Sequence, residues 1–169
     1  MKLYISHTLG RQDEHLLTIL AFRLRDEGFG ISDTTQPLSA HKRKHLLSLD
    51  AQASIVSSDM LIGIVTKTGN PADLLYKEWD LAIQEQIPCG LLVETGAVVD
   101  KKYQAYAVPF NRLDLSKTST LLEEKRRYYL SEYEPLESRA LNKAQRIAWS
   151  AVYDVLLTIL PVFDSKVSV

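Results

Sequence analysis

Short apolar runs alternate with longer amphipathic segments over the first 115 residues of the chain. The apolar runs predict β-strands at residues 3–6, 29–32, 60–65, 88–93 and 105–110. The run 60–65 is apolar at nearly every position, which is typical of a central parallel strand covered on both faces. The amphipathic segments between the strands predict helices at residues 14–27, 40–57 and 72–86.

This alternation is typical of an α/β fold in which helices cover both faces of a parallel central sheet. We expect a flavodoxin-like sheet with 3–6, 60–65 and 88–93 as neighbouring inner strands, because these runs are the most continuously apolar. Asp13 stands at the N-cap position of the first helix. Gly28 follows the last apolar repeat of that helix, where a glycine commonly ends a helix.

The character of the chain changes after residue 115. Residues 116–138 are highly charged and rich in tyrosine, which is more typical of a solvated helix than of a partner surface. Residues 141–160 predict an extra C-terminal helix that ends before Pro161. Its apolar spacing predicts five buried side chains, those of Ala144, Ile147, Ala151, Val155 and Ile159. We expect a single domain over 1–169, with a core of about 1–115, a charged helical extension of about 116–140 and a C-terminal helix of about 141–163.

Composition limits the partners of the chain. The formal net charge is −1, from 20 basic and 21 acidic residues, so nothing electrostatic favours binding to nucleic acid or to an acidic membrane. Cys89 is the single cysteine, which predicts no disulfide and a reducing compartment. The N-terminal apolar run is too short for a signal peptide, and no apolar stretch reaches the roughly 20 residues that a bilayer requires. We therefore expect a soluble, cytoplasmic protein whose fold needs no metal ion.

One acidic side chain falls on the apolar face of the helix predicted at 72–86. At about 100° per residue, Glu78 lies about 40° from Leu74, between the positions of Leu81 and Ala82. A carboxylate there is directed at the sheet, near the carboxyl ends of the strands, where open parallel sheets bind ligands. Burying it costs several kcal/mol unless it is paired or protonated. The structural alternative is a Glu78 that reaches solvent at the helix edge or pairs with a buried cation.

Four segments in order resemble Toll/interleukin-1 receptor (TIR) domains, over about residues 1–115. "LYISH" resembles the first-strand box, and "RLRDEGFGISD" is similar to the end of the first helix and the second strand, closing on Asp33. "IVSSDMLIGIVT" resembles the end of the second helix and the third strand. "LLYKEWDLAIQEQIPCGLLV" is similar to the third-helix motif, in which Lys-Glu opens a helix that leads into the fourth strand. The chain departs from the family at Leu74, where an aromatic residue is common.

The resemblance implies an enzyme of the stand-alone, prokaryotic-type, NAD-cleaving branch, acting in antiviral signalling. Glu78 then corresponds to the catalytic glutamate. Substrate-binding positions implied by the family are Ser6, His7, Thr8, Asp33, Thr34 and Trp79. The resemblance further implies that NAD or a related nucleotide is the substrate, that no cofactor is needed, and that copies of the chain self-associate into TIR assemblies.

Each of these positions also has a structural interpretation. Residues 6–8 fit ordinary turn chemistry after a strand, and Asp33 fits a cap of the following loop. Trp79 lies at the edge of the apolar arc and fits a core residue better than a platform for a base.

Two other functions compete with NAD cleavage. Nucleoside 2-deoxyribosyltransferases share a related sheet and a helical glutamate, but their Asp-Gly-Thr lead into it is replaced here by Asn70-Pro71-Ala72-Asp73. A non-enzymatic TIR-like adaptor or ligand-sensing module is the alternative of a different class. The missing glycine in the loop after the second strand favours an adaptor, and the inward-facing Glu78 disfavours it.

Overall fold

The structure is a computed structural model that describes residues 1–10, 13–33, 47–104, 106–111, 120, 123–124, 126–127 and 143–164. These residues form the strands β1 (Lys2–His7), β2 (Gly30–Asp33), β3 (Met60–Val65), β4 (Cys89–Glu94) and β5 (Ala107–Phe110). They also form the helices α1 (Glu14–Asp26), α2 (Leu49–Val56), α3 (Asp73–Gln84), α4 (Lys101–Gln104) and α6 (Lys143–Asp164). The sequence pattern does not predict the short helix α4.

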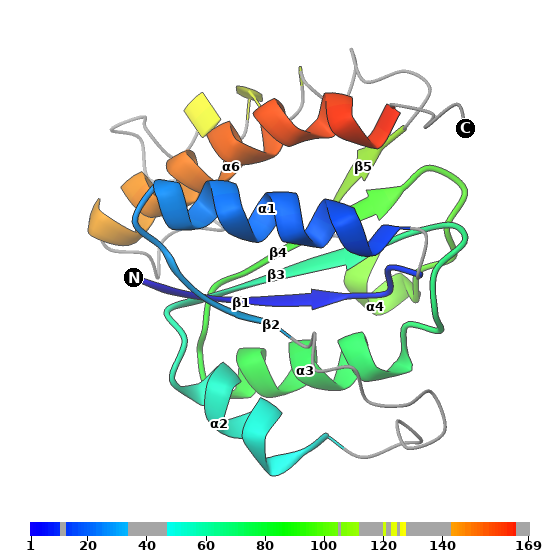
Figure 1. The fold of residues 1–169 in the computed structure, drawn as a ribbon. Helices are drawn as coiled ribbons and strands as arrows, with labels where there is room; N and C mark the ends of the chain where they lie inside the picture. Colours follow the sequence, from blue (N-terminus) through cyan, green and yellow to red (C-terminus); the bar gives the residue numbers. More distant parts are fainter. Residues whose placement is uncertain are drawn as a thin grey trace.

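The described strands lie parallel in one sheet, in the order β2-β1-β3-β4-β5. Strand β3 lies between β1 and β4 and is buried at every position, which confirms the three predicted inner strands. Helices α1 and α6 cover one face of the sheet, and α2 and α3 cover the other (Figure 1). The predicted α/β fold with a flavodoxin-like strand order is therefore confirmed.

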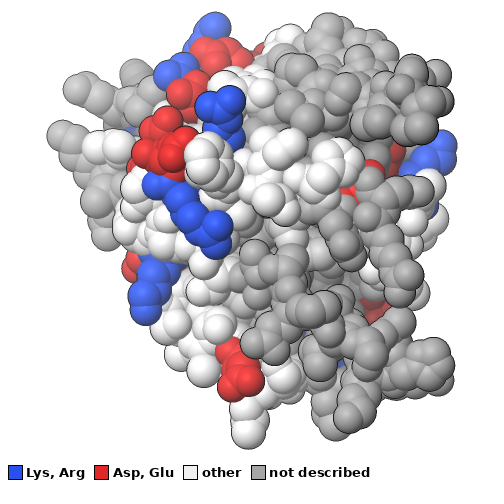
Figure 2. All heavy atoms as spheres, viewed as in Figure 1, with Lys and Arg blue, Asp and Glu red and all other residues white. Residues whose placement is uncertain are grey.

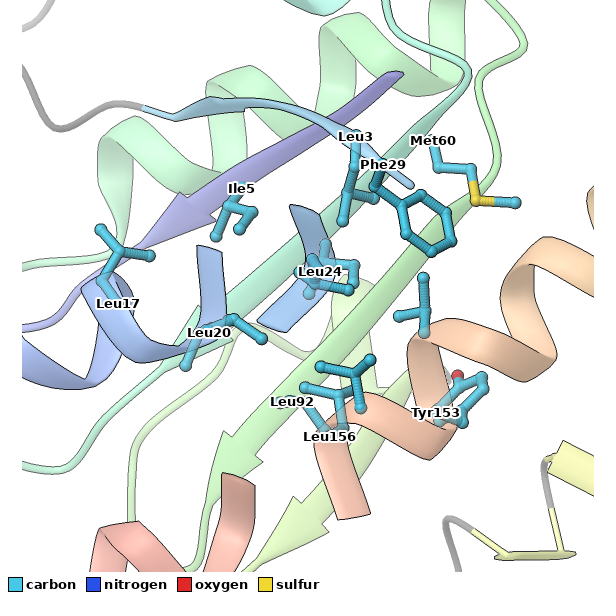
Figure 3. Close-up of a cluster of buried hydrophobic side chains, with 14 of the residues drawn as sticks. Leu3, Ile5, Leu17, Leu20, Leu24, Phe29, Met60, Leu92, Tyr153 and Leu156 are labelled. Atoms are coloured by element: carbon cyan, nitrogen blue, oxygen red, sulfur yellow. The ribbon is translucent and has the colours of Figure 1, made fainter. Parts of the chain in front are cut away.

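Each face of the sheet carries its own apolar core. The core under α1 and α6 contains Leu3 and Ile5 of β1 and extends to both helices. Figure 3 shows these two side chains together with Leu20 of α1 and Leu156 of α6. The core under α2 and α3 contains the alternate residues of the sheet, beginning with Tyr4. This division follows from the period of two along a strand.

The ends of α1 agree in part with the prediction. Gly28 has φ +86° and follows the helix. Its N–H donates to the Arg25 carbonyl at 2.9 Å, and the N–H of Phe29 donates to the Leu24 carbonyl at 3.0 Å. This pair of bonds is a Schellman motif, in which glycine takes the left-handed conformation at no steric cost. Asp13 occupies the N-cap position, but its side chain makes no capping hydrogen bond.

The helix predicted at 40–57 begins later than expected. Leu47 and Ser48 are not helical, and residues 40–46 lie outside the described residues. Ser48 has an extended backbone, and its hydroxyl accepts a hydrogen bond from the N–H of Ala51 at 3.1 Å. A serine N-cap of this kind satisfies a backbone donor that the first turn leaves open, so α2 starts at Leu49.

The last helix does not end before Pro161, as its apolar spacing predicts, and instead reaches the outer bound of about residue 163. Helix α6 continues past Pro161 to Asp164. A proline removes one backbone hydrogen bond and crowds the preceding turn. So close to the C-terminal end of a long helix, that loss does not stop the remaining residues from staying helical.

The predicted buried face of α6 is also wrong in part. Ile147 is 53% exposed and Ala151 is half-buried, whereas Val155 is buried as expected. The side chains of Ala144 and Ile159 lie outside the described residues. The face that meets the sheet contains Trp149, Val152, Tyr153 and Leu156. The two aromatic rings bury more area than Ile147 and Ala151, and they set the rotation of the helix.

On the face of the molecule seen in Figure 2, basic and acidic side chains lie beside one another, and the described residues show no broad area of one sign. This mixture agrees with the near-balance of charge in the sequence. A helix long and apolar enough to cross a bilayer is absent from the described part of the chain.

Candidate active site

Strand β1 directs two hydroxyl groups toward α3. Because side chains alternate along a strand, Tyr4 and Ser6 point to the face opposite Leu3 and Ile5. Tyr4 belongs to the core under α2 and α3, and Ser6 is fully buried. A single strand thus supplies apolar packing to one layer and polar donors to the other.

Helix α3 presents one carboxylate to the same place. Its buried residues are Leu75, Glu78, Trp79 and Ala82, which recur at helical spacing. Gly63 of β3 lets this face come close to the sheet, because a Cβ at that position would lie 3.3 Å from the Trp79 ring and 2.7 Å from Leu91. The centre of the buried face falls nearer Trp79 than the sequence predicts.

The Glu78 carboxylate lies between the two hydroxyls of β1. Its Oε1 accepts a hydrogen bond from the Tyr4 hydroxyl at 2.8 Å. Its Oε2 accepts a hydrogen bond from the Ser6 hydroxyl. Only 1% of the Glu78 surface is exposed, so the alternative in which this side chain reaches solvent is wrong. Bonds from hydroxyls to a charged acceptor are shorter and stronger than neutral ones, and they orient the group.

The loops after β1 and β3 are joined beside this carboxylate, at the point where the strand order reverses. The Thr8 hydroxyl accepts a hydrogen bond from the Thr66 N–H at 2.9 Å. The Thr8 carbonyl accepts a second bond from the Asn70 N–H at 2.6 Å, and the Asn70 side chain donates to the Leu9 carbonyl at 3.1 Å. These bonds join the loop that follows β1 to the loop that leads into α3, the helix that carries Glu78.

Gly69 is required by this junction. A Cβ on Gly69 would lie 2.1 Å from the Thr8 carbonyl oxygen and 2.4 Å from the Thr66 hydroxyl. Real side chains do not approach backbone atoms so closely. The loop can therefore close on Thr8 only with glycine at this position.

The predicted site residues have different places in this arrangement. Ser6 and Glu78 are in direct contact. Thr8 is buried in the loop junction, and His7 is half-buried at the end of β1. The Asp33 backbone ends β2 opposite Ile5, while its side chain and all of Thr34 lie outside the described residues.

Trp79 is fully buried. Its ring meets Tyr103 edge-on at 6.3 Å between centroids. A platform for a base must expose one face of the ring, so this position favours the core interpretation of Trp79.

Sequence reasoning missed Tyr4. It was hidden inside an apolar run, where an aromatic residue normally means packing. The available signal is its spacing, because Tyr4 and Ser6 are two residues apart and share the face of the strand that meets α3.

One flank of α3, at Tyr76 and Asp80, meets α4. The rings of Tyr76 and Tyr103 stack at 4.3 Å, and Lys102 bonds both oxygens of Asp80 at 2.7 and 2.8 Å. The hydrogen bond to Asp80 raises the pKa of Lys102, and burial raises the pKa of Tyr103. Both groups stay protonated at neutral pH, and these contacts hold α4 against α3.

No protein-family model and no curated protein matches the chain. Among solved structures, the CMP N-glycosidase BcmB of Clostridium botulinum is similar at 12% sequence identity and a TM-score of 0.45. The similarity covers 73% of this chain and 98% of that one. A similarity this low identifies neither a family nor an activity. The resemblance to TIR domains stays a prediction.

The geometry defines what the site can do chemically. Glu78 offers a carboxylate that the hydroxyls of Tyr4 and Ser6 orient, one at each oxygen. Such a group can stabilise a developing positive charge or attack an electrophilic carbon. Nowhere among the described residues do three His, Cys, Asp or Glu side chains gather closely enough to hold a metal ion.

Proposed function

We propose that the protein cleaves the bond between nicotinamide and ribose in NAD, with Glu78 as the catalytic carboxylate. One observation carries the proposal: a glutamate with 1% exposure is held on both oxygens by the hydroxyls of Tyr4 and Ser6. Stability alone favours an apolar residue at such a position, since burying a charge is costly.

The reaction needs little more than a well-placed negative charge. As the bond breaks, its electron pair leaves with nicotinamide, which departs as a neutral ring and needs no proton. The ribose left behind resembles an oxocarbenium ion, which a carboxylate stabilises electrostatically or traps as a glycosyl ester, as in retaining glycosidases. Water then adds at the anomeric carbon and loses a proton, giving ADP-ribose; where an ester has formed, its bond to the carboxylate breaks in this step and frees Glu78. A hydroxyl of the same nucleotide in place of water gives a cyclic product.

The position in the fold supports the proposal. Ser6 lies next to the last residue of β1, and the neighbouring loops after β1 and β3 meet where the strand order reverses. Ligands of open parallel sheets bind beyond the carboxyl ends of the strands at this reversal. A buried carboxylate at this place disfavours the adaptor, in which Glu78 would be incidental.

The first experiment measures nicotinamide release from NAD by the wild-type protein, both dilute and with a crowding agent that promotes association. Glu78→Gln keeps the size of the side chain and removes its charge. We expect turnover to fall by about 10²–10³, or roughly 3–4 kcal/mol of barrier, with a much smaller change in KM. Full activity in this variant would exclude Glu78 as the catalytic group.

The same assay identifies the bond that is cleaved. A 2′-deoxynucleoside and a nucleoside monophosphate are offered in place of NAD, and the free base is measured. Release of base from these compounds, without release from NAD, would favour a nucleoside-type N-glycosidase over the proposed function. No release from any of them, associated or dilute, would favour the adaptor.

A further inference from the structure

We infer that Tyr4 is a positioning residue for Glu78: its hydroxyl holds Oε1 so that the carboxylate is already oriented when the substrate arrives. This inference rests on the proposed function. It assigns a role in turnover to a residue inside the first strand, at a position where packing alone would require only a ring.

The placement of Tyr4 separates its ring from its hydroxyl. The ring is 1% exposed and packs in the core between the sheet and the helices α2 and α3. A phenylalanine would fill this space equally well. The added hydroxyl is costly to bury unless it is bonded, and it donates a hydrogen bond to Glu78 at 2.8 Å.

Two donors on two different oxygens fix the plane of the Glu78 carboxylate, which one donor cannot do. The terminal torsion of a glutamate is broad, so a carboxylate held at one oxygen still turns about its last bond. Ser6 holds Oε2 and Tyr4 holds Oε1, and together they fix the plane of the group. Both donors stand on one rigid inner strand, two residues apart, so their spacing does not change when the loops move.

A fixed carboxylate plane acts mainly on the rate of the chemical step. Groups that are oriented in advance do not need to reorganise as charge develops on the ribose. The bound substrate in its ground state gains less from this orientation. Tyr4→Phe should therefore lower kcat about tenfold and leave the KM for NAD within about twofold of the wild-type value.

Tyr103→Phe is the matched control. It removes the same hydroxyl from another buried tyrosine, whose partner is also a carboxylate of α3, Asp80, at 3.0 Å. Tyr103 fastens α4 and does not touch Glu78. We expect its kcat to equal the wild-type value, whatever change it makes to the melting temperature.

A double-mutant cycle tests whether Tyr4 acts through Glu78. If it does, Tyr4→Phe added to Glu78→Gln should produce no further loss of kcat, although each change alone lowers it. Melting temperatures are measured for all four proteins. A lower melting temperature in Tyr4→Phe with unchanged kcat would mean a purely structural role and would overturn the inference.

The outcomes separate the two proposals. An inactive Glu78→Gln with a fully active Tyr4→Phe overturns the role of Tyr4 and leaves the proposed function standing. A further tenfold loss in the double variant also overturns it, because Tyr4 would then act independently of Glu78. A wild-type protein that releases no nicotinamide, dilute or associated, overturns both.

Discussion

A carboxylate as buried as that of Glu78 loses most of the hydration that stabilises its charge. The hydroxyls of Tyr4 and Ser6 replace part of that hydration with fixed dipoles. Because these hydroxyls are held in place, they do not need to reorient when positive charge develops on the ribose. At the scale of the residue, the cost in stability and the capacity for catalysis have the same origin.

This shared origin predicts the stability of Glu78→Gln. Removing the charge removes the desolvation cost, while the amide still bonds to the hydroxyls. We expect an unchanged or slightly higher melting temperature together with the loss of nicotinamide release. A Glu78 that serves only to pair with a buried cation predicts the opposite, a lower melting temperature with activity retained. Thermal unfolding of both proteins in one buffer decides between them.

Cys89 shows burial acting on a group outside the site. Burial raises the pKa of its thiol to about 12, against about 8.5 in an unfolded chain. At pH 8, Cys89 is therefore a thiolate in a far smaller fraction of folded than of unfolded molecules. A thiolate of higher pKa is intrinsically more nucleophilic, but this difference only partly offsets the smaller fraction. We expect alkylation by iodoacetamide to be more than tenfold slower in the folded protein than in urea.

The same shift has a defined sign for stability. The folded state keeps the Cys89 proton at a pH where the unfolded state has lost it. The contribution of this thiol to the free energy of unfolding is complete below about pH 8.5 and is lost as the pH rises toward 12. Equal alkylation rates in the folded and unfolded protein would contradict this placement of Cys89.

At the scale of the element, α6 is part of the core. Its Trp149 ring lies against Gly90 of β4, where a Cβ would come within 2.7 Å of the ring. Trp149 and Tyr153 both belong to the core shared with α1 and β1. The rotation of a helix on a sheet is decided by its largest side chains, because they bury the most area.

This rotation predicts different results for two residues of one helix. Trp149→Ala should lower the free energy of unfolding by about 3–5 kcal/mol, since it empties a buried site. Ile147→Ala, at an exposed position of the same helix, should change it by less than about 1 kcal/mol. Urea unfolding measures both. A larger loss for Ile147→Ala would mean that α6 meets the sheet with the other face.

The loop between β3 and α3 offers a second test at this scale. Gly69→Ala places a Cβ against the Thr8 carbonyl, so it should lower the free energy of unfolding by about 1–3 kcal/mol. The control is Gly10→Ala in the neighbouring loop, where the nearest atom lies at 3.5 Å, an ordinary contact. If both variants unfold at the same urea concentration as the wild type, the two loops do not close as described.

At the scale of the whole molecule, the two helical layers differ, because only one of them carries the candidate site. The layer of α1 and α6 provides apolar packing against β1, β3 and β4. The layer of α2 and α3 has its own apolar core and also carries Glu78. The site therefore stands on inner strands that are held from both sides, which keeps its donors in register.

Self-association is the prediction that belongs to this scale. The TIR resemblance implies that neighbouring subunits complete the pocket. Nicotinamide release per molecule should then rise with protein concentration or with a crowding agent, and sedimentation should show larger species under the same conditions. A rate strictly proportional to enzyme over a hundredfold range, in a protein that sediments as a monomer, would count against assembly.

The sequence alone determined the parts of this protein that depend on local pattern. The strands β1, β3 and β4, the glycine that ends α1 and the inward face of α3 with Glu78 all follow from the spacing of apolar residues. Apolar residues that face a core recur every two residues in a strand and about every 3.6 residues in a helix. Both spacings can be recognised in one amino-acid sequence.

Only the tertiary structure decided which residues meet. Tyr4 and Ser6 stand 74 and 72 positions from Glu78, and periodicity assigns each residue a face but no partner. The rotation of α6 depended likewise on the space left by Gly90 in a distant strand. Hydroxyls that hold a carboxylate and rings that fill a gap are contacts between elements. They are determined by how the layers pack, and the pattern within any one element does not contain them.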